Sequence, residues 1–238
     1  MSKPVVQKKS RFKGLTEGLF SALIAALIIR QFLIQAYTIP TSSMEDTLLI
    51  GDFLLVNKFN YGMRTPDWIG IPYTKIGFDV PWFRFPALRQ PQPYDVVVFR
   101  YPRDHSLDYI KRCIAKGGQT VEIINKVVYV DGKKFPLPPH AKFVDPRIFQ
   151  RDEGHFFFPT FRNLGSRDNY GPITIPKGKY WMMGDNRDNS SDSRVWGFVD
   201  HSEIVGQALI IYFSWDSKEP ITNIFKKIRF GRIGRVIR

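Results

Sequence analysis

A run of twelve uncharged, mostly apolar residues, Gly18 to Ile29, lies near the amino end of this 238-residue sequence and ends at Arg30. A run of this length suits a buried core helix, the apolar part of a signal peptide, or a membrane span extended through Tyr37. Bulky residues follow the run and five cationic residues precede it, which favours an anchor whose N-terminus stays cytoplasmic. We therefore predict a single transmembrane helix over residues 15–37, behind a basic cytoplasmic leader at residues 1–14.

Beyond Pro40 the helical period disappears, and short runs of β-branched and aromatic residues recur between prolines and glycines. Such runs favour strands. The four clearest are residues 53–56, 96–101, 127–130 and 208–213. Asp131-Gly132 directly follows the third run and is typical of a tight hairpin turn. Because no helical pattern separates these runs, we predict a mostly β fold.

A proline-rich segment interrupts the β pattern. Residues 119–172 contain six prolines, which favours loops and short strands. We predict an inserted β subdomain there. Residues 38–118 and 173–218 would then form the main β domain, and residues 219–238 a basic C-terminal tail.

The formal net charge of +13 lies almost entirely at the two ends of the chain. Five basic residues and no acid lie in residues 1–14, and six basic residues and no acid in residues 225–238. Nucleic acid is the usual partner of such a charge, but a nearly balanced body argues against one. We expect the tail to rest on anionic membrane lipids through a helical face. That face comprises Ile221, Ile224, Phe225 and Ile228.

The metal-binding residue types are few and poorly spaced. The single cysteine, Cys113, excludes a disulfide framework and a cysteine-ligated zinc or iron–sulfur site. The four histidines show no metal-ligand spacing. Alternating Asp, Asn and Ser in residues 183–198 resemble a calcium loop, but the required Gly and Glu positions hold Ser191 and Gly197. We predict no metal and no cofactor.

Three clusters carry residues capable of chemistry, and each has an ordinary structural alternative. Thr41, Ser42 and Ser43 follow the apolar segment and equally suit a turn. Lys111 lies in a strand-like stretch and equally suits a position facing solvent. The Asp- and Asn-rich loop at residues 183–198 also suits a purely hydrogen-bonded loop.

A serine nucleophile needs a base, and neither a convincing histidine nor a Gly-x-Ser-x-Gly elbow is present. In Ser–Lys chemistry a neutral lysine is the base. This requires the lysine pKa to fall by roughly two units from about 10.4, at about 1.4 kcal/mol per unit. Burial in an apolar environment lowers a lysine pKa. Lys111, beside Ile110 and Cys113, is the best-placed candidate.

Four motifs occur in order behind the apolar segment. They are Ile-Pro-Thr-Ser-Ser-Met at 39–44, Leu-Leu-Ile-Gly-Asp-Phe at 48–53, Asp-Tyr-Ile-Lys-Arg at 108–112, and Gly-Asp-Asn-Arg-Asp-Asn-Ser-Ser-Asp-Ser-Arg-x-Trp-Gly at 184–197. This order resembles that of bacterial type I signal peptidases, also called leader peptidases. The resemblance implies a mostly β, signal-peptidase-like catalytic body that faces outward from the cytoplasmic (inner) membrane, held by one anchor.

The same resemblance implies roles for individual residues. Ser43 would be the nucleophile and Lys111 the general base, with the lysine amine oriented by Ser190. Thr41 and the Ser43 backbone N–H would hold the oxyanion. Structural support would come from two ion pairs, Asp185 with Arg112 and Asp192 with Arg194. The residues expected to line the substrate pockets are Ile39, Met44, Leu48, Tyr109 and Ile110.

The implied substrates are exported preproteins with small residues one and three positions before the cut. Two other classes compete with this hypothesis. A self-cleaving Ser–Lys repressor would need a helix-turn-helix before Ser43, where the apolar segment lies. A non-enzymatic anchored β domain would lack Ser43 or Lys111, and both are present.

The sequence departs from the family pattern at three places. Glu45-Asp46 stands where the family often has a proline before Thr-Leu. Residues 93–95 and 115–119 also differ from the common turns. None of these is a proposed catalytic residue, so we expect the differences to lie in loop geometry.

Overall fold

A seven-stranded antiparallel sheet forms the body of the computed structural model, which describes residues 11–65, 68–70, 76–156 and 164–238. Its strand order is β1-β2-β13-β5-β6-β11-β12. The strands are β1 Ile34–Thr38, β2 Asp52–Asn57, β5 Val96–Tyr101, β6 Asp104–Lys116, β11 Lys179–Met183, β12 Val199–Asp200 and β13 Ile204–Ser214. Two strands of this sheet position the candidate site: Ser43 follows β1, and Lys111 lies on β6.

A second, four-stranded sheet has the order β10-β7-β8-β9. Its strands are β7 Thr120–Ile124, β8 Val127–Val130, β9 Lys133–Lys134 and β10 Tyr170–Thr174. It falls in the segment predicted as an insertion, of which residues 157–163 lie outside the described part. A short pair, β3 Trp68–Gly70 and β4 Gly77–Asp79, forms a third sheet.

The prediction of a mostly β fold is confirmed. The four predicted strand segments lie in β2, β5, β8 and β13. The predicted hairpin turn joins β8 to β9, where Asp131 and Gly132 have φ values of 51° and 73°. Positive φ at both central residues is what a type I′ hairpin turn requires.

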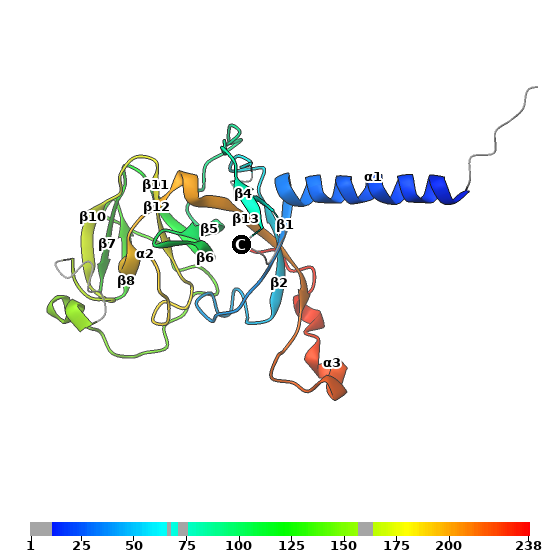
Figure 1. Ribbon diagram of the computed structural model, residues 1–238. Helices are drawn as coiled ribbons and strands as arrows, with labels where there is room; N and C mark the ends of the chain where they lie inside the picture. Colours follow the sequence, from blue (N-terminus) through cyan, green and yellow to red (C-terminus); the bar gives the residue numbers. More distant parts are fainter. Residues whose placement is uncertain (1–10, 66–67, 71–75, 157–163) are drawn as a thin grey trace, which may run out of the picture.

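Helix α1, Arg11–Phe32, projects from the start of β1 away from the β body (Figure 1). Its described side chains, among them Leu15, Leu19 and Phe20, are exposed. Among the described residues, no helix combines the length and the apolar character needed to cross a membrane. The predicted anchor reached residue 37, but the helix ends at Phe32, because residues 34–38 pair with β2 as β1. Membrane crossing stays a prediction, and most of the predicted leader, residues 1–10, lies outside the described residues.

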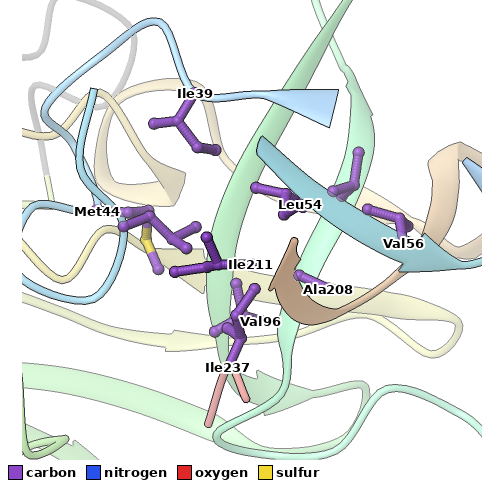
Figure 2. Packing of buried hydrophobic residues seen from close by; sticks show 10 residues of the cluster. Ile39, Met44, Leu54, Val56, Val96, Ala208, Ile211 and Ile237 are labelled. Carbon is purple, nitrogen blue, oxygen red and sulfur yellow. The ribbon is translucent and has the colours of Figure 1, made fainter. Parts of the chain in front are cut away.

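An apolar core under β2, β5 and β13 holds the loop between β1 and β2. Figure 2 shows Met44 of this loop within a cluster formed by Leu54, Val56, Val96, Ala208 and Ile211. Met44 and Leu48 are completely buried. Their burial anchors the loop in the core. It therefore fixes the position of Ser43, the residue before Met44, relative to the core.

The basic tail folds onto β13. Three short turns, η3 Ile221–Asn223, α3 Ile224–Lys227 and η4 Phe230–Arg232, precede backbone hydrogen bonds from residues 234–237 to β13. Arg232 contacts both oxygens of the buried Asp52 carboxylate, at 3.0 and 2.5 Å. Three of the four residues of the expected helical face, Ile221, Ile224 and Phe225, lie in the unbroken helical stretch formed by η3 and α3, whereas Ile228 forms a β-bridge with Trp215. The residues after this stretch satisfy part of their backbone hydrogen bonding on β13.

Candidate active site

Ser43 lies in the loop between β1 and β2, which backbone hydrogen bonds close at its base. Ile39 N donates to Asp52 O at 2.9 Å, and Gly51 N donates to Ile39 O at 3.0 Å. From the opposite side, Asn186 N donates to Ser43 O at 3.1 Å. The serine backbone is thus held at its carbonyl, while its side chain lines a groove.

Lys111 lies on β6, and the lysine is only 4% exposed. Its Nζ donates to Ser43 Oγ at 2.8 Å and to Ile110 O at 2.9 Å. Burial lowers the pKa of Lys111 to about 8, although Asp192 and Asp185 act in the opposite direction. A lysine with this pKa is neutral in about a tenth of molecules at pH 7, and the neutral amine can accept a proton from the hydroxyl it contacts.

Arg112, the next residue on β6, forms a bidentate ion pair with Asp185. Its Nε lies 2.7 Å from Asp185 Oδ1 and its Nη2 2.6 Å from Oδ2. Thr47 Oγ1 also donates to this carboxylate, at 2.6 Å. The nucleophile loop, the lysine strand and the loop after β11 therefore converge on one buried carboxylate.

Asp192 and Arg194 form the second predicted ion pair, in the loop that faces the lysine. Asp192 caps the short helix α2, Ser193–Trp196, and accepts from Arg194 Nε at 2.9 Å. Arg194 Nη2 in turn donates to the carbonyl of Arg187 at 2.6 Å. All three residues are buried. The side chains of Asp192 and Arg194 satisfy one another, whereas Nε and Nη2 of Arg187 have no hydrogen-bond partner in the described residues.

Gly184 lies where this loop runs close to the Ser43 backbone. A Cβ atom there would lie 2.2 Å from Ser190 Oγ and 2.5 Å from Ser43 O, far closer than packing permits. Ser190 thus lies near the Ser43 backbone, but its hydroxyl is buried with no hydrogen-bond partner in the described residues. The direct bond to the lysine amine that the sequence analysis expects is not formed.

Thr41 lies near the nucleophile as well, with Oγ1 3.4 Å from Ser43 Oγ. The two hydroxyls face the same groove. A threonine hydroxyl at this position can donate to an oxygen bound beside the serine.

The groove beside Ser43 has a volume of about 270 Å³. Residues 40–43 line one side and residues 108–111 the other. Strand β6 pairs with β11 only from Arg112 onward. Within the described residues, the wall formed by residues 108–111 therefore has a strand edge that can offer backbone groups to an extended peptide.

The residues predicted to line substrate pockets fall into two groups. Tyr109 and Ile110 line the groove. Ile39, Met44 and Leu48 instead belong to the buried apolar core beneath it. All five are apolar or aromatic, and residue type alone does not distinguish a groove wall from the core behind it.

Three polar residues of the site were not predicted from the sequence. Asn186 holds the Ser43 carbonyl, and Asp108 lines the groove. Tyr37 Oη donates to Asp108 Oδ2 at 3.0 Å. Asn186 and Asp108 belong to quoted motifs, so their position could have been suspected, but no local signal links Tyr37 to Asp108.

Metal-binding side chains do not gather in the described part of the chain, where no group of three or more His, Cys, Asp or Glu could hold a metal ion. His105, His140 and His201 contact Glu203, Arg235 and Tyr180. The buried Cys113 is free, and burial raises the pKa of its thiol. The polar groups that converge on Ser43 are thus lysine, threonine and asparagine.

Residues 13–215 match the family described as signal peptidase, peptidase S26. The chain belongs to this family. A signal peptidase I of Aquifex aeolicus (strain VF5) is 34% identical over 235 residues, which cover 82% of each chain. A signal peptidase I of Pseudomonas aeruginosa is 36% identical over 236 residues, covering 92% of this chain and 77% of the relative.

A solved signal peptidase I from Enterococcus faecalis V583 is 26% identical, with a TM-score of 0.34, and covers 50% of this chain and 97% of that chain. Membership of the signal peptidase family makes this chain a peptidase, a hydrolase of peptide bonds. The family match spans the nucleophile loop, β6 and the 184–194 loop.

Proposed function

We propose that this chain removes N-terminal signal peptides from exported preproteins, with Ser43 as nucleophile and Lys111 as general base. The observation that carries the proposal is the 2.8 Å contact between Lys111 Nζ and Ser43 Oγ, at a lysine whose pKa burial lowers to about 8. The names of the relatives support the substrate class.

Acylation begins when the neutral Lys111 amine takes the proton of Ser43 Oγ. The oxygen attacks the carbonyl carbon before the cut, and the former C=O bond becomes a C–O⁻ single bond. The C–N bond then breaks, and Lys111 gives its proton to the departing amine. The mature protein leaves with its new N-terminus, and the signal peptide remains as an ester on Ser43.

Deacylation repeats the sequence with water. Lys111 takes a proton from the water as its oxygen attacks the ester carbon. The ester C–O bond breaks, and the proton returns to Ser43 Oγ. The signal peptide leaves with a free carboxylate, and both side chains are restored.

Two hydroxyl groups assist these steps. The Thr41 hydroxyl and the Ser43 backbone N–H donate to the oxyanion, an assignment supported by the 3.4 Å separation of Thr41 Oγ1 and Ser43 Oγ. Removing one such donor typically costs about 3 kcal/mol of barrier. Ser190, buried beside Ser43 with a free hydroxyl, is placed to accept a hydrogen bond from the lysine amine during the reaction.

Substrate binds in an extended conformation between the two groove walls. Its backbone pairs with the free edge of β6, and Tyr109 and Ile110 leave space only for small side chains one and three positions before the cut. Ile39, Met44 and Leu48 set the depth of the groove from below. Arg112, Asp185, Asp192 and Arg194 hold the walls at a fixed separation.

Attachment of this chain to the membrane brings its β body close to the preproteins that it cleaves. Helix α1 is a single-pass anchor, with the basic leader in the cytoplasm and the β body on the outer side of the cytoplasmic membrane. The exposed apolar side chains of α1 support contact with lipid, and the leader follows the positive-inside rule. The exposed Phe225 in the basic tail provides a second lipid contact.

The test is cleavage of a preprotein with Ala-x-Ala before the junction. Wild type releases the mature protein, whereas Ser43→Ala and Lys111→Met lose at least about a thousandfold in kcat. Ser106→Ala and Lys134→Met, at exposed positions away from the groove, serve as matched controls and cleave as wild type does. Full activity in either site variant would overturn the Ser–Lys assignment.

A further inference from the structure

Lys142 lies in the inserted segment, beside the loop residues that hold the Ser43 carbonyl. Its N–H donates to Asp185 O at 2.8 Å, and its carbonyl accepts from Arg187 N at 3.0 Å. Asn186, between those two residues, donates its N–H to Ser43 O at 3.1 Å. Successive backbone groups of an extended stretch point to opposite edges. This stretch therefore lies between the inserted segment on one edge and the loop that carries Ser43 on the other.

The side chain of Lys142 reaches past this stretch to the loop that carries Ser43. Its Nζ lies 3.1 Å from Glu45 Oε2 and 3.1 Å from Asp46 Oδ2. The side-chain amide of Asn186 also donates to Glu45 Oε2, at 3.3 Å. One residue of the inserted segment therefore contacts both of the loops that position the nucleophile.

Glu45 and Asp46 are adjacent acids that follow Ser43 closely in the chain. Without a cation beside them their like charges would repel each other, and the loop would be held less firmly. Partial burial lowers the pKa of Lys142, but its bonds to Asp46 and Glu45 act in the opposite direction and raise the pKa overall. The amine therefore stays charged over the pH range in which Lys111 loses its proton.

We propose that Lys142 is a positioning residue for the cleavage reaction, acting through its two ion pairs on the loop that carries Ser43. These ion pairs keep Ser43 Oγ at 2.8 Å from Lys111 Nζ, within the distance that proton transfer requires. The inference rests on the proposed function and gives the inserted segment a role in it. Lys142 is not among the described residues that line the groove, so it acts on the nucleophile and not on the substrate.

The size of the effect follows from the exposure of the ion pairs. The Lys142 side chain is 28% exposed, and partly exposed pairs add little to overall stability and are screened by salt. A shift of about 1 Å at a reacting atom, in contrast, can cost about a hundredfold in rate. Loss of the pairs should therefore lower kcat more than it lowers resistance to urea.

The experiment compares wild type with Lys142→Met in cleavage of the Ala-x-Ala preprotein by the full chain in detergent. Methionine keeps most of the apolar stem without the charge. We expect kcat to fall about threefold to tenfold, while KM stays within about twofold of wild type because the groove is unchanged. Lys142→Arg keeps the charge and should retain at least about half of the wild-type kcat. In about 1 M salt the kcat values of wild type and Lys142→Met should converge, because salt screens the pairs.

A second variant tests whether Lys142 acts through the two acids. It combines Glu45→Gln with Asp46→Asn, which remove both charges but keep the shapes of the side chains. Adding Lys142→Met to this variant should lower kcat no further, since the interaction is already lost. A further loss as large as in the wild-type background would overturn the inference.

Lys134→Met is the matched control, because Lys134 is an exposed lysine of the same inserted segment and forms no ion pair in the described part of the chain. It should cleave as wild type does. Wild-type kcat in Lys142→Met, or a change confined to KM, would overturn the inference. If Lys142→Met does not fold, the variant of Glu45 and Asp46 decides, and wild-type kcat in that variant overturns the inference equally. Failure of wild type to cleave the preprotein would instead reject the proposed function.

Discussion

Arg112 and Asp185 form a bidentate ion pair in which the two side chains are 1% and 0% exposed. Arg112 directly follows Lys111 on β6, and successive side chains of a strand point to opposite faces. The pair therefore fixes the strand from the face opposite the lysine. It also holds Thr47, which lies four residues after Ser43.

Replacing Asp185 by asparagine leaves the buried Arg112 charge without its counterion. We expect the free energy of unfolding to fall by about 3 to 5 kcal/mol, measured by urea denaturation. The control is Lys179→Gln, which removes an exposed contact with Asp200 at 3.7 Å and should change stability by less than about 1 kcal/mol. A loss for Asp185→Asn no larger than this control would show that the pair is dispensable.

The pH dependence of cleavage should follow the Lys111 amine. The base acts only when deprotonated, and burial lowers its pKa to about 8. We therefore expect kcat/KM to rise about tenfold per pH unit below pH 8 and to level off above it. A profile that instead levels off near pH 6 would indicate a histidine base.

The same lowered pKa costs stability at neutral pH. In the unfolded chain the pKa of Lys111 is about 10.4, whereas in the folded chain burial lowers it to about 8. Between these values the unfolded state binds more protons, so unfolding free energy rises with pH. Lys111→Met should be more stable than wild type at pH 7, and this advantage should shrink by about 3 kcal/mol toward pH 10. A constant difference between the two proteins would contradict the assignment.

The sequence predicted the fold well where the signal was local. Runs of β-branched residues lie in β2, β5, β8 and β13, and the Asp131-Gly132 turn forms because both residues accept positive φ. In the tail, Ile221, Ile224 and Phe225 of the expected helical face lie in η3 and α3, but the pairing of residues 234–237 with β13 was not predicted, because no local pattern reports such a distant partner. The end of α1 was missed for the same reason: residues 34–38 are apolar enough to extend a helix, but pair with β2.

Within the site, motif resemblance located Ser43 and Lys111, whose contact joins residues 68 positions apart. It did not separate groove from core at Met44 and Leu48, because both environments select apolar side chains. It also did not find the hydrogen bond from Tyr37 to Asp108, because the two residues lie 71 positions apart and no local pattern links them.

Adding a single methyl group to Gly184 should disable the site. The new Cβ would collide with Ser190 Oγ and with the Ser43 carbonyl, so the nucleophile must shift. A displacement of about 1 Å can cost about a hundredfold in rate, and we expect Gly184→Ala to lose at least that much in kcat. Gly231→Ala, where nothing lies within 4 Å of the added atom, should cleave normally. Comparable activity in the two variants would show that the loop yields without disturbing Ser43.

Asp46 stands where the resemblance to type I signal peptidases implies a proline, and its backbone conformation does not suit one. Its φ is 75°, whereas proline is restricted to about −65°. Lys142 Nζ lies 3.1 Å from Asp46 Oδ2 and 3.1 Å from Glu45 Oε2, which ties the loop that carries Ser43 to the inserted segment. We expect Asp46→Pro to lose about 3 kcal/mol or more of stability, together with most of its cleavage activity.

Two variants serve as controls. Asp46→Gly accepts positive φ freely and should stay within about 1 kcal/mol of wild type in urea denaturation. Asp46→Asn tolerates the same conformation without the charge, so it separates the effect of the ion pair from that of the backbone. If Asp46→Pro folds and cleaves like Asp46→Gly, the left-handed conformation is not required by the loop.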